Sequence, residues 1–135
     1  MLLLLAPSLL VALLLFTAGA QAAEPDTAAQ QHARGWSALR AMDCARCHGR
    51  DYDGWAAPSL IASVRDTSRE RFERWLLDGD IGRGMPGYAS QPLVVAELDA
   101  IYTYLLARAQ GQIGAGKPRA DAARPAPGPN CATGC

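Results

Sequence analysis

The sequence predicts a small all-α domain. Three stretches, near residues 27–42, 67–79 and 90–111, combine helix-capping residues with apolar side chains at helical spacing. The globular part has no stretch with the strict apolar and polar alternation that is typical of a β-strand. Residues 44–48 also carry two cysteines and a histidine within a single turn, and few comparable side chains occur elsewhere in the globular region.

Each helical stretch has its own start or stop signal. Thr27 can cap a first helix that runs toward Met42. The segment Thr67-Ser68-Arg69-Glu70 has the Thr-x-x-Glu form of a capping box, and Gly79 is placed to end the short helix that follows it. Ser90 is predicted to cap the longest helix, which has a proline in its first turn. This last helix is long enough to pack on the first one.

Two segments lack helical periodicity. Residues 49–60 contain glycines and a proline, and we interpret them as a loop that wraps around a neighbouring group. Residues 113–135 are rich in Gly, Ala and Pro and predict a flexible tail. Cys131 and Cys135 in this tail can form a small disulfide loop, join two chains or stay free. The predicted domain therefore spans residues 23–112.

The segment Cys44-Ala45-Arg46-Cys47-His48 has the pattern of a c-type haem attachment site. Two thiols three positions apart can each add across a vinyl group of one porphyrin, and the imidazole that follows then lies under the iron. Cys44 and Cys47 are therefore predicted to hold one haem c covalently. His48 is predicted to be the proximal iron ligand.

Three other interpretations of this segment fit the sequence less well. A zinc site needs a second pair of ligands at similar spacing, and Cys131 and Cys135 have no histidine nearby. A thioredoxin-like redox pair needs strands around it, which the sequence does not predict. A disulfide between Cys44 and Cys47 is compatible with an oxidising compartment, but it gives no role to His48.

Three more residues complete the predicted site. The carbonyl of Pro58 is the expected hydrogen-bond partner for the second ring nitrogen of His48, since a metal-bound histidine usually donates that N–H. Met85 is the predicted sixth ligand, because glycines and a proline surround it and Met42 lies on the proximal side. Trp75 is predicted as a core residue that lines the haem pocket, whereas His32 is expected at the surface.

Residues 1–22 are predicted to be a secretory signal peptide. They contain no charged side chain, they are mostly apolar up to Phe16, and Ala20-Gln21-Ala22 suggests cleavage after Ala22. An uncleaved membrane anchor is the alternative, because the n-region has no Lys or Arg and the uncharged run approaches the length of a membrane span. All 13 Lys+Arg and all 13 Asp+Glu residues follow this segment, so nucleic acid is not an expected partner.

Together these residues resemble the class I cytochrome c family. The resemblance covers about residues 27–110 and lies in Cys44-Ala45-Arg46-Cys47-His48-Gly49, Ala57-Pro58-Ser59-Leu60, Met85-Pro86 and Ile101-Tyr102-Thr103-Tyr104-Leu105. It implies crossed N- and C-terminal helices around one covalently bound haem, with His48 and Met85 as axial iron ligands. The cysteine-bearing tail departs from the family pattern.

The expected function follows from this ligand set. Iron held by histidine and methionine has no open position for a substrate, so we predict a periplasmic one-electron carrier and not an enzyme. The loop 82–88 looks most like small cytochromes that serve quinoprotein alcohol dehydrogenases, which suggests such a dehydrogenase as donor and a terminal oxidase or another cytochrome as acceptor. A fixed haem subunit of a dehydrogenase complex, and a haem enzyme or gas sensor with a dissociable Met85, stay open.

Overall fold

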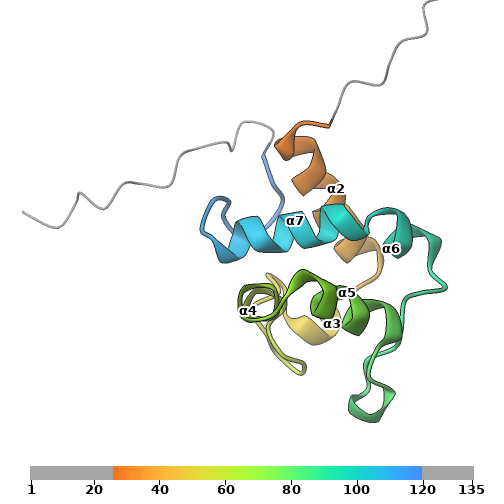
Figure 1. Ribbon diagram of the computed structural model, residues 1–135. Helices are drawn as coiled ribbons and strands as arrows, with labels where there is room; N and C mark the ends of the chain where they lie inside the picture. The colour runs from red at the N-terminus through yellow and green to blue at the C-terminus, as the bar shows by residue number, and fades with distance from the viewer. Residues whose placement is uncertain (1–25, 120–135) are drawn as a thin grey trace, which may run out of the picture.

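The computed structural model describes residues 26–119, so the predicted signal peptide, Cys131 and Cys135 lie outside the described residues. The helices of this part are α2 (Ala28–Ala41), α3 (Ala45–His48), α4 (Leu60–Asp66), α5 (Arg69–Asp78), a 3-10 turn η1 (Ile81–Arg83), α6 (Pro92–Ala96) and α7 (Leu98–Ala109) (Figure 1). Between residues 26 and 119 the single β-type pairing is an isolated bridge between Asp80 and Met85. The fold is all-α, as predicted.

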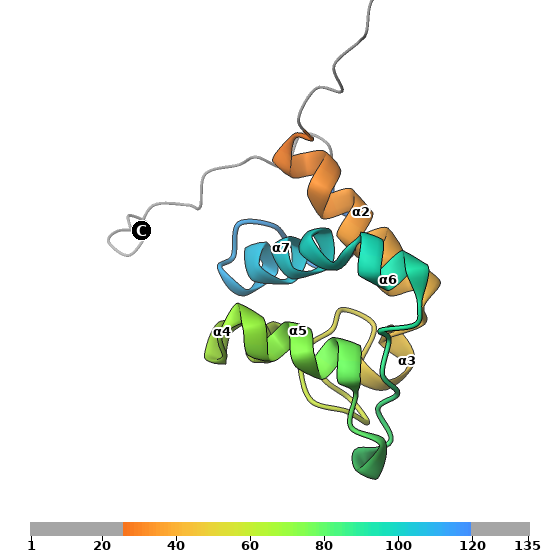
Figure 2. The same ribbon diagram turned by 45° about the vertical axis from the view of Figure 1, so that its right-hand side comes forward.

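Helix α7 is the centre of the fold. In both views it lies between α2 on one side and the α4–α5 pair on the other, with α3 beside the far end of α5 (Figures 1 and 2). Its side chains are the most completely buried ones, and Ala100, Tyr104 and Leu105 have no exposed surface. The core continues into Leu39 of α2, Val64 of α4, Phe72 and Leu76 of α5 and Val94 of α6.

The crossing of α2 and α7 depends on a glycine. A Cβ atom on Gly35 would lie 2.1 Å from the carbonyl oxygen of Ala100 and 2.9 Å from Cβ of Tyr104. Real side-chain atoms do not approach backbone atoms this closely, so the two helix backbones touch only because residue 35 has no side chain. The predicted crossing of the first and last helices is therefore present, and Gly35 sets its distance.

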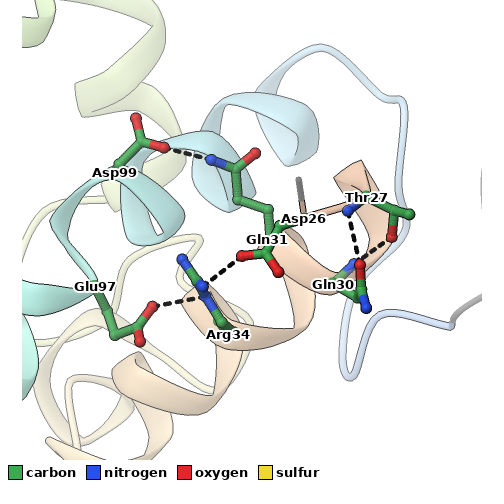
Figure 3. Close-up of polar contacts among 7 residues, drawn as sticks. All are labelled: Asp26, Thr27, Gln30, Gln31, Arg34, Glu97 and Asp99. Atoms are coloured by element: carbon green, nitrogen blue, oxygen red, sulfur yellow. Dashed lines mark hydrogen bonds and ion pairs between the residues drawn. The ribbon is translucent and has the colours of Figure 1, made fainter. Parts of the chain in front are cut away.

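Polar contacts accompany the crossing on the solvent side (Figure 3). Arg34 lies between Asp26 and Glu97, and its Nε is 3.0 Å from Oε2 of Glu97. Gln31 donates a hydrogen bond from its side-chain amide to the carboxylate of Asp99. Partly exposed pairs of this kind each contribute little to stability. They add to the orientation that the buried contacts establish.

The start of α2 matches the sequence, whereas the start of α5 differs by one residue. Thr27 and Gln30 form a reciprocal capping box at the start of α2 (Figure 3). At α5 the predicted cap, Thr67, ends the preceding helix instead, since its hydroxyl donates to the carbonyl of Ser63 at 2.7 Å. Ser68 is the N-cap of α5 and accepts a hydrogen bond from the backbone N–H of Arg71. Gly79 ends α5, as predicted.

The sequence analysis did not predict one helix, and its prediction for the last helix was wrong. Helix α4 was not predicted, although Ser59 caps it by accepting from the backbone N–H of Ala62 at 3.1 Å. The last helix does not begin at Ser90 and is not continuous: Gln91 is the N-cap of α6, and Glu97 separates α6 from α7. The break lies where the carboxylate of Glu97 turns toward Arg34 of α2.

The domain continues beyond the predicted boundary at residue 112. Ile113 is buried in the core, and the hydroxyl of Tyr104 donates to the carbonyl of Gly116 at 3.3 Å. Arg108, whose side chain is 8% exposed, donates to the same hydroxyl and lies 3.6 Å from a carboxylate oxygen of Asp53. The first residues of the predicted tail are thus part of the fold. In the described part of the chain no helix is long and apolar enough to cross a membrane.

We expect Gly35→Ala to destabilise the domain strongly. The new methyl group must push α2 and α7 apart, which we expect to cost about 3 kcal/mol in the free energy of unfolding. Urea unfolding of the purified protein, followed by circular dichroism, measures this. Gly114→Ala is the control, because a Cβ there meets nothing within 4 Å. Equal stability of the two variants would contradict the role given to Gly35.

Candidate haem attachment site

The chain turns sharply between α2 and the cysteines. Asp43 has φ of 53°, a left-handed conformation that aspartate tolerates better than most residues. The backbone N–H of Cys44 bonds to the carbonyl of Leu39 at 3.1 Å, so the first cysteine is tied to the end of α2. The position of the attachment segment is therefore set by the helix that crosses α7.

Helix α3 places the two cysteines on one side of a single turn. The backbone N–H groups of Cys47 and His48 both bond to the carbonyl of Cys44, at 3.3 and 3.0 Å. Residues three apart on a helical turn are neighbours, so both thiols can reach the same bound group. Both are free, with Cys44 half-buried and Cys47 exposed. The alternative of a Cys44–Cys47 disulfide is therefore not what the structure contains.

Burial raises the pKa of the Cys44 thiol to about 11, and the charges of Asp43 and Cys47 act in the same direction. In the absence of haem, burial therefore disfavours the thiolate form of Cys44. A protonated thiol is a poor nucleophile and a poor metal ligand.

The ring of His48 is held by the loop that follows it. Its Nδ1 lies 2.7 Å from the carbonyl oxygen of Pro58, the partner expected from the sequence. A carbonyl oxygen only accepts, so Nδ1 carries the proton and Nε2 stays available to a metal. The loop is itself tied to the motif, because the N–H of Gly54 bonds to the carbonyl of His48 at 2.8 Å and that of Ala57 to Cys47 at 2.9 Å.

Tyr52 anchors this loop in the core, although no periodic pattern in the sequence indicates that it is buried. It has φ of 66°, which is rare for a bulky residue, yet its side chain is only 1% exposed. Its ring meets that of Tyr104 edge-on at 6.3 Å, and its carbonyl accepts from the N–H of Leu60 at 3.0 Å. The packing in the core offsets the backbone strain, and the segment that contains Pro58 is held by both ends.

Met85 lies in a loop that returns to the cysteines. It is half-buried and packs against the core, as do Cys44 and Tyr88. Burial raises the pKa of Tyr88, and the nearby Cys44 and Cys47 raise it further. The structure therefore brings residues 44, 85 and 88 to one part of the molecule. Met42 packs against the same core, at the end of α2.

The predicted tryptophan of the site is not a core residue. Trp75 is 46% exposed, and the guanidinium of Arg71 lies 5.7 Å from its ring. Its role in lining a haem pocket stays a prediction. His32 is partly exposed on α2, and burial lowers its pKa.

Comparisons with known proteins identify the family. The family model described as cytochrome C oxidase, cbb3-type, subunit III matches residues 30–105. The chain belongs to the c-type cytochromes. Cytochrome c-555 from Methylococcus capsulatus is 31% identical over 84 residues, which cover 62% of this chain and 67% of that protein.

A solved relative agrees with the fold. The crystal structure of the c-type cytochrome XoxG from Methylobacterium extorquens AM1 superposes with a TM-score of 0.60 at 31% identity, and the match covers 66% of this chain. This chain spans 57% of the length of the XoxG chain. This similarity confirms the predicted all-α cytochrome c fold and the resemblance from which it was expected.

Family membership implies a covalently bound haem c with its iron, and the residues present fit this group. The cytochrome offers two free thiols on one turn and a histidine whose Nε2 is available. Between residues 26 and 119 no group of three or more His, Cys, Asp or Glu side chains is arranged to hold a metal ion, so a zinc cluster is not supported there. As a member of the c-type cytochromes, the chain is an electron-transfer protein.

We expect Tyr52→Phe to change the alkaline stability of the cytochrome. Burial raises the pKa of Tyr52 from its ordinary value of 10.0 to about 12, with Tyr104 as the second cause. The folded state then holds a proton that the unfolded state releases, so stability is complete below pH 10 and falls between about pH 10 and 12. Phenylalanine cannot ionise, so the variant should lose less stability in this window, by at most about 3 kcal/mol.

At neutral pH the same variant should be as stable as the parent or slightly more stable. No group forms a hydrogen bond of normal geometry with the buried hydroxyl of Tyr52, and Arg40 is near enough only to lower its pKa slightly against the effect of burial, so removal of the hydroxyl leaves no bonded donor or acceptor unpaired. Urea unfolding at a series of pH values measures both effects. If the variant loses as much stability above pH 10 as the parent does, ionisation of Tyr52 is not the cause of that loss.

Proposed function

We propose that this cytochrome is a periplasmic one-electron carrier in which His48 and Met85 are the axial ligands of the haem iron. Cys44 and Cys47 form the thioether bonds to the porphyrin. The observation that carries the proposal is the hydrogen bond between Nδ1 of His48 and the carbonyl of Pro58, at 2.7 Å. This bond selects the tautomer whose Nε2 can bind iron and holds the ring in one orientation.

Met85 supplies the ligand on the opposite side. Its thioether is soft and neutral, and it favours Fe(II) over Fe(III) more than an anionic ligand does. The half-buried position of Met85 against the same core as Cys44 supports this role. Met42 is the other methionine of the domain, but it directly precedes the attachment turn and therefore lies on the proximal side.

Bound haem c supplies a one-electron Fe(III)/Fe(II) couple. With His48 and Met85 both in place, this chain leaves no position at the metal for a substrate or a gas. His48 and Met85 can stay bound in both oxidation states, so little reorganisation accompanies the gain or loss of an electron. These properties suit a carrier that alternates between a donor and an acceptor.

The compartment and the partners are part of the proposal. Residues 1–22 have the pattern of a signal peptide, which supports export to the periplasm. We propose a quinoprotein dehydrogenase as donor and a terminal oxidase or another cytochrome as acceptor. Ala56 and Pro86 are exposed small residues near the attachment turn and the Met85 loop, and a partner can approach closely there. A carrier must dissociate quickly, so the contact should bury less than about 1,200 Å².

The test compares Met85→Leu with Met42→Leu. Both changes remove one sulfur and nearly conserve volume, so neither should unfold the protein. Met85→Leu should abolish the weak near-infrared-edge absorption of a ferric sulfur–iron bond, allow carbon monoxide to bind the ferrous protein, and lower the potential by more than about 59 mV, a tenfold change in the redox equilibrium. Met42→Leu should leave all three unchanged. The reverse pattern would make Met42 the ligand.

A further inference from the structure

The loop that carries Met85 is closed at its base by its own backbone. Asp80 and Met85 exchange two hydrogen bonds, from the N–H of Asp80 to the carbonyl of Met85 at 2.8 Å and from the N–H of Met85 to the carbonyl of Asp80 at 3.0 Å. The intervening residues 81–84 form the η1 turn, which ends at Gly84. Met85 is thus the last residue of a small closed ring.

A second set of bonds joins the returning chain to α5. The backbone N–H groups of Tyr88 and Ala89 bond to the carbonyls of Leu76 and Leu77, each at 3.1 Å. These carbonyls belong to the last turn of α5, where they have no partner within the helix. The chain on both sides of Met85 is therefore tied to the end of one helix.

Two glycines allow this attachment by touching each other. A Cβ atom on Gly79 would lie 2.4 Å from the backbone nitrogen of Gly87 and 2.7 Å from the carbonyl oxygen of Met85. A Cβ atom on Gly87 would lie 2.6 Å from the carbonyl oxygen of Asp78. Every atom that they would meet is backbone, which cannot move aside as the end of a flexible side chain can. Neither glycine can gain a side chain unless the returning chain moves away from α5.

We propose that Gly79 and Gly87 are positioning residues for Met85. Their backbone contact clips the returning chain onto α5 and thereby restricts where the thioether of Met85 can be presented. The inference rests on the proposed function, because it assumes that Met85 binds the iron. It adds that the strength of the bond between Met85 and the iron is controlled by the contact between Gly79 and Gly87, neither of which touches the metal.

The outer part of the same loop is not part of the clip. Ile81 and Arg83 are 76% and 88% exposed, and the turn that contains them projects beyond the helices (Figure 2). A Cβ atom on Gly82 would meet only a side-chain oxygen of Asp80, at 3.6 Å, which is an ordinary contact. Gly82 also has no positive φ, and neither has Gly87, so alanine at either position adds no left-handed backbone strain. Gly82 and Gly87 are therefore matched sites for an alanine substitution.

The experiment compares Gly87→Ala with Gly82→Ala in the haem-loaded protein. Gly87→Ala should reduce the ferric sulfur–iron absorption by at least half and raise the rate of carbon monoxide binding at least tenfold. It should also shift the redox equilibrium toward Fe(III) by up to tenfold, about 59 mV, while helix content and covalent haem are retained. Gly82→Ala should match the parent in every measurement. Equal spectra for the two variants would overturn the inference.

A double variant separates the clip from the ligand. In a Met85→Leu background, Gly87→Ala should cause no further change in potential or carbon monoxide binding, because the ligand it positions is gone. A further shift of the same size would show that Gly87 acts on the haem site by another route. If Met85→Leu itself leaves the parent spectrum intact, the proposed ligand is wrong. A failure of Gly87→Ala alone leaves that ligand in place and removes only the clip.

Amide hydrogen exchange on the unmodified cytochrome gives a measurement that does not depend on a variant that folds. The N–H groups of Tyr88 and Ala89 should exchange at least tenfold more slowly than those of Ile81 and Gly82 in the exposed outer turn. Exchange at equal rates would contradict a clip at the end of α5. A Gly87→Ala variant that fails to retain its helices would also overturn the inference, since the contact would then support the whole domain.

Discussion

The backbone contact between α2 and α7 is the constraint on which the haem site depends. Gly35 lets the carbonyl of Ala100 approach to a distance that a side chain would forbid, and this sets the position of both helices. The end of α2 continues into the turn that carries the cysteines, so the crossing places Cys44. On the other side of the crossing, α7 presents Tyr104, against which Tyr52 packs. The loop that bonds to His48 is therefore oriented by the same pair of helices.

The two proposed iron ligands are held by different physical means. His48 is fixed by a side-chain hydrogen bond to a loop, and that loop is secured by a buried aromatic ring at Tyr52. Met85 has no such bond, because a thioether is a weak hydrogen-bond acceptor. Its position depends on backbone bonds to the end of α5 and on a glycine contact. The position of His48 is therefore sensitive to substitutions in the core, whereas the position of Met85 is sensitive to the backbone conformation of its loop.

Features that depend on residues close together in the chain were predictable from the sequence, whereas features that depend on contacts between distant residues were not. The Thr27 cap, the cysteine and histidine spacing and the Pro58 carbonyl depend on residues close together in the chain, and the structure contains each of them. Thr67 and Ser68 are both good caps, and the choice of Ser68 follows from how α4 ends. The positive φ of Tyr52 is accepted only because Tyr104 packs on its ring, 52 positions later in the sequence. Trp75 was expected inside by its residue type, but the core positions of α5 belong to Phe72 and Leu76.

The contacts around the cysteines also differ from the helix crossing in their separation along the chain. The bond between His48 and Pro58 joins residues ten apart, whereas the bond between Gln31 and Asp99 joins residues 68 apart. Closing the longer loop costs about 1.7 kcal/mol more in chain entropy. Residues 44–58 are also synthesised before α7 exists. The local bonds around the cysteines can therefore form early, but Tyr52 of the same loop packs on Tyr104, so we expect the loop to become fully ordered only when α7 docks.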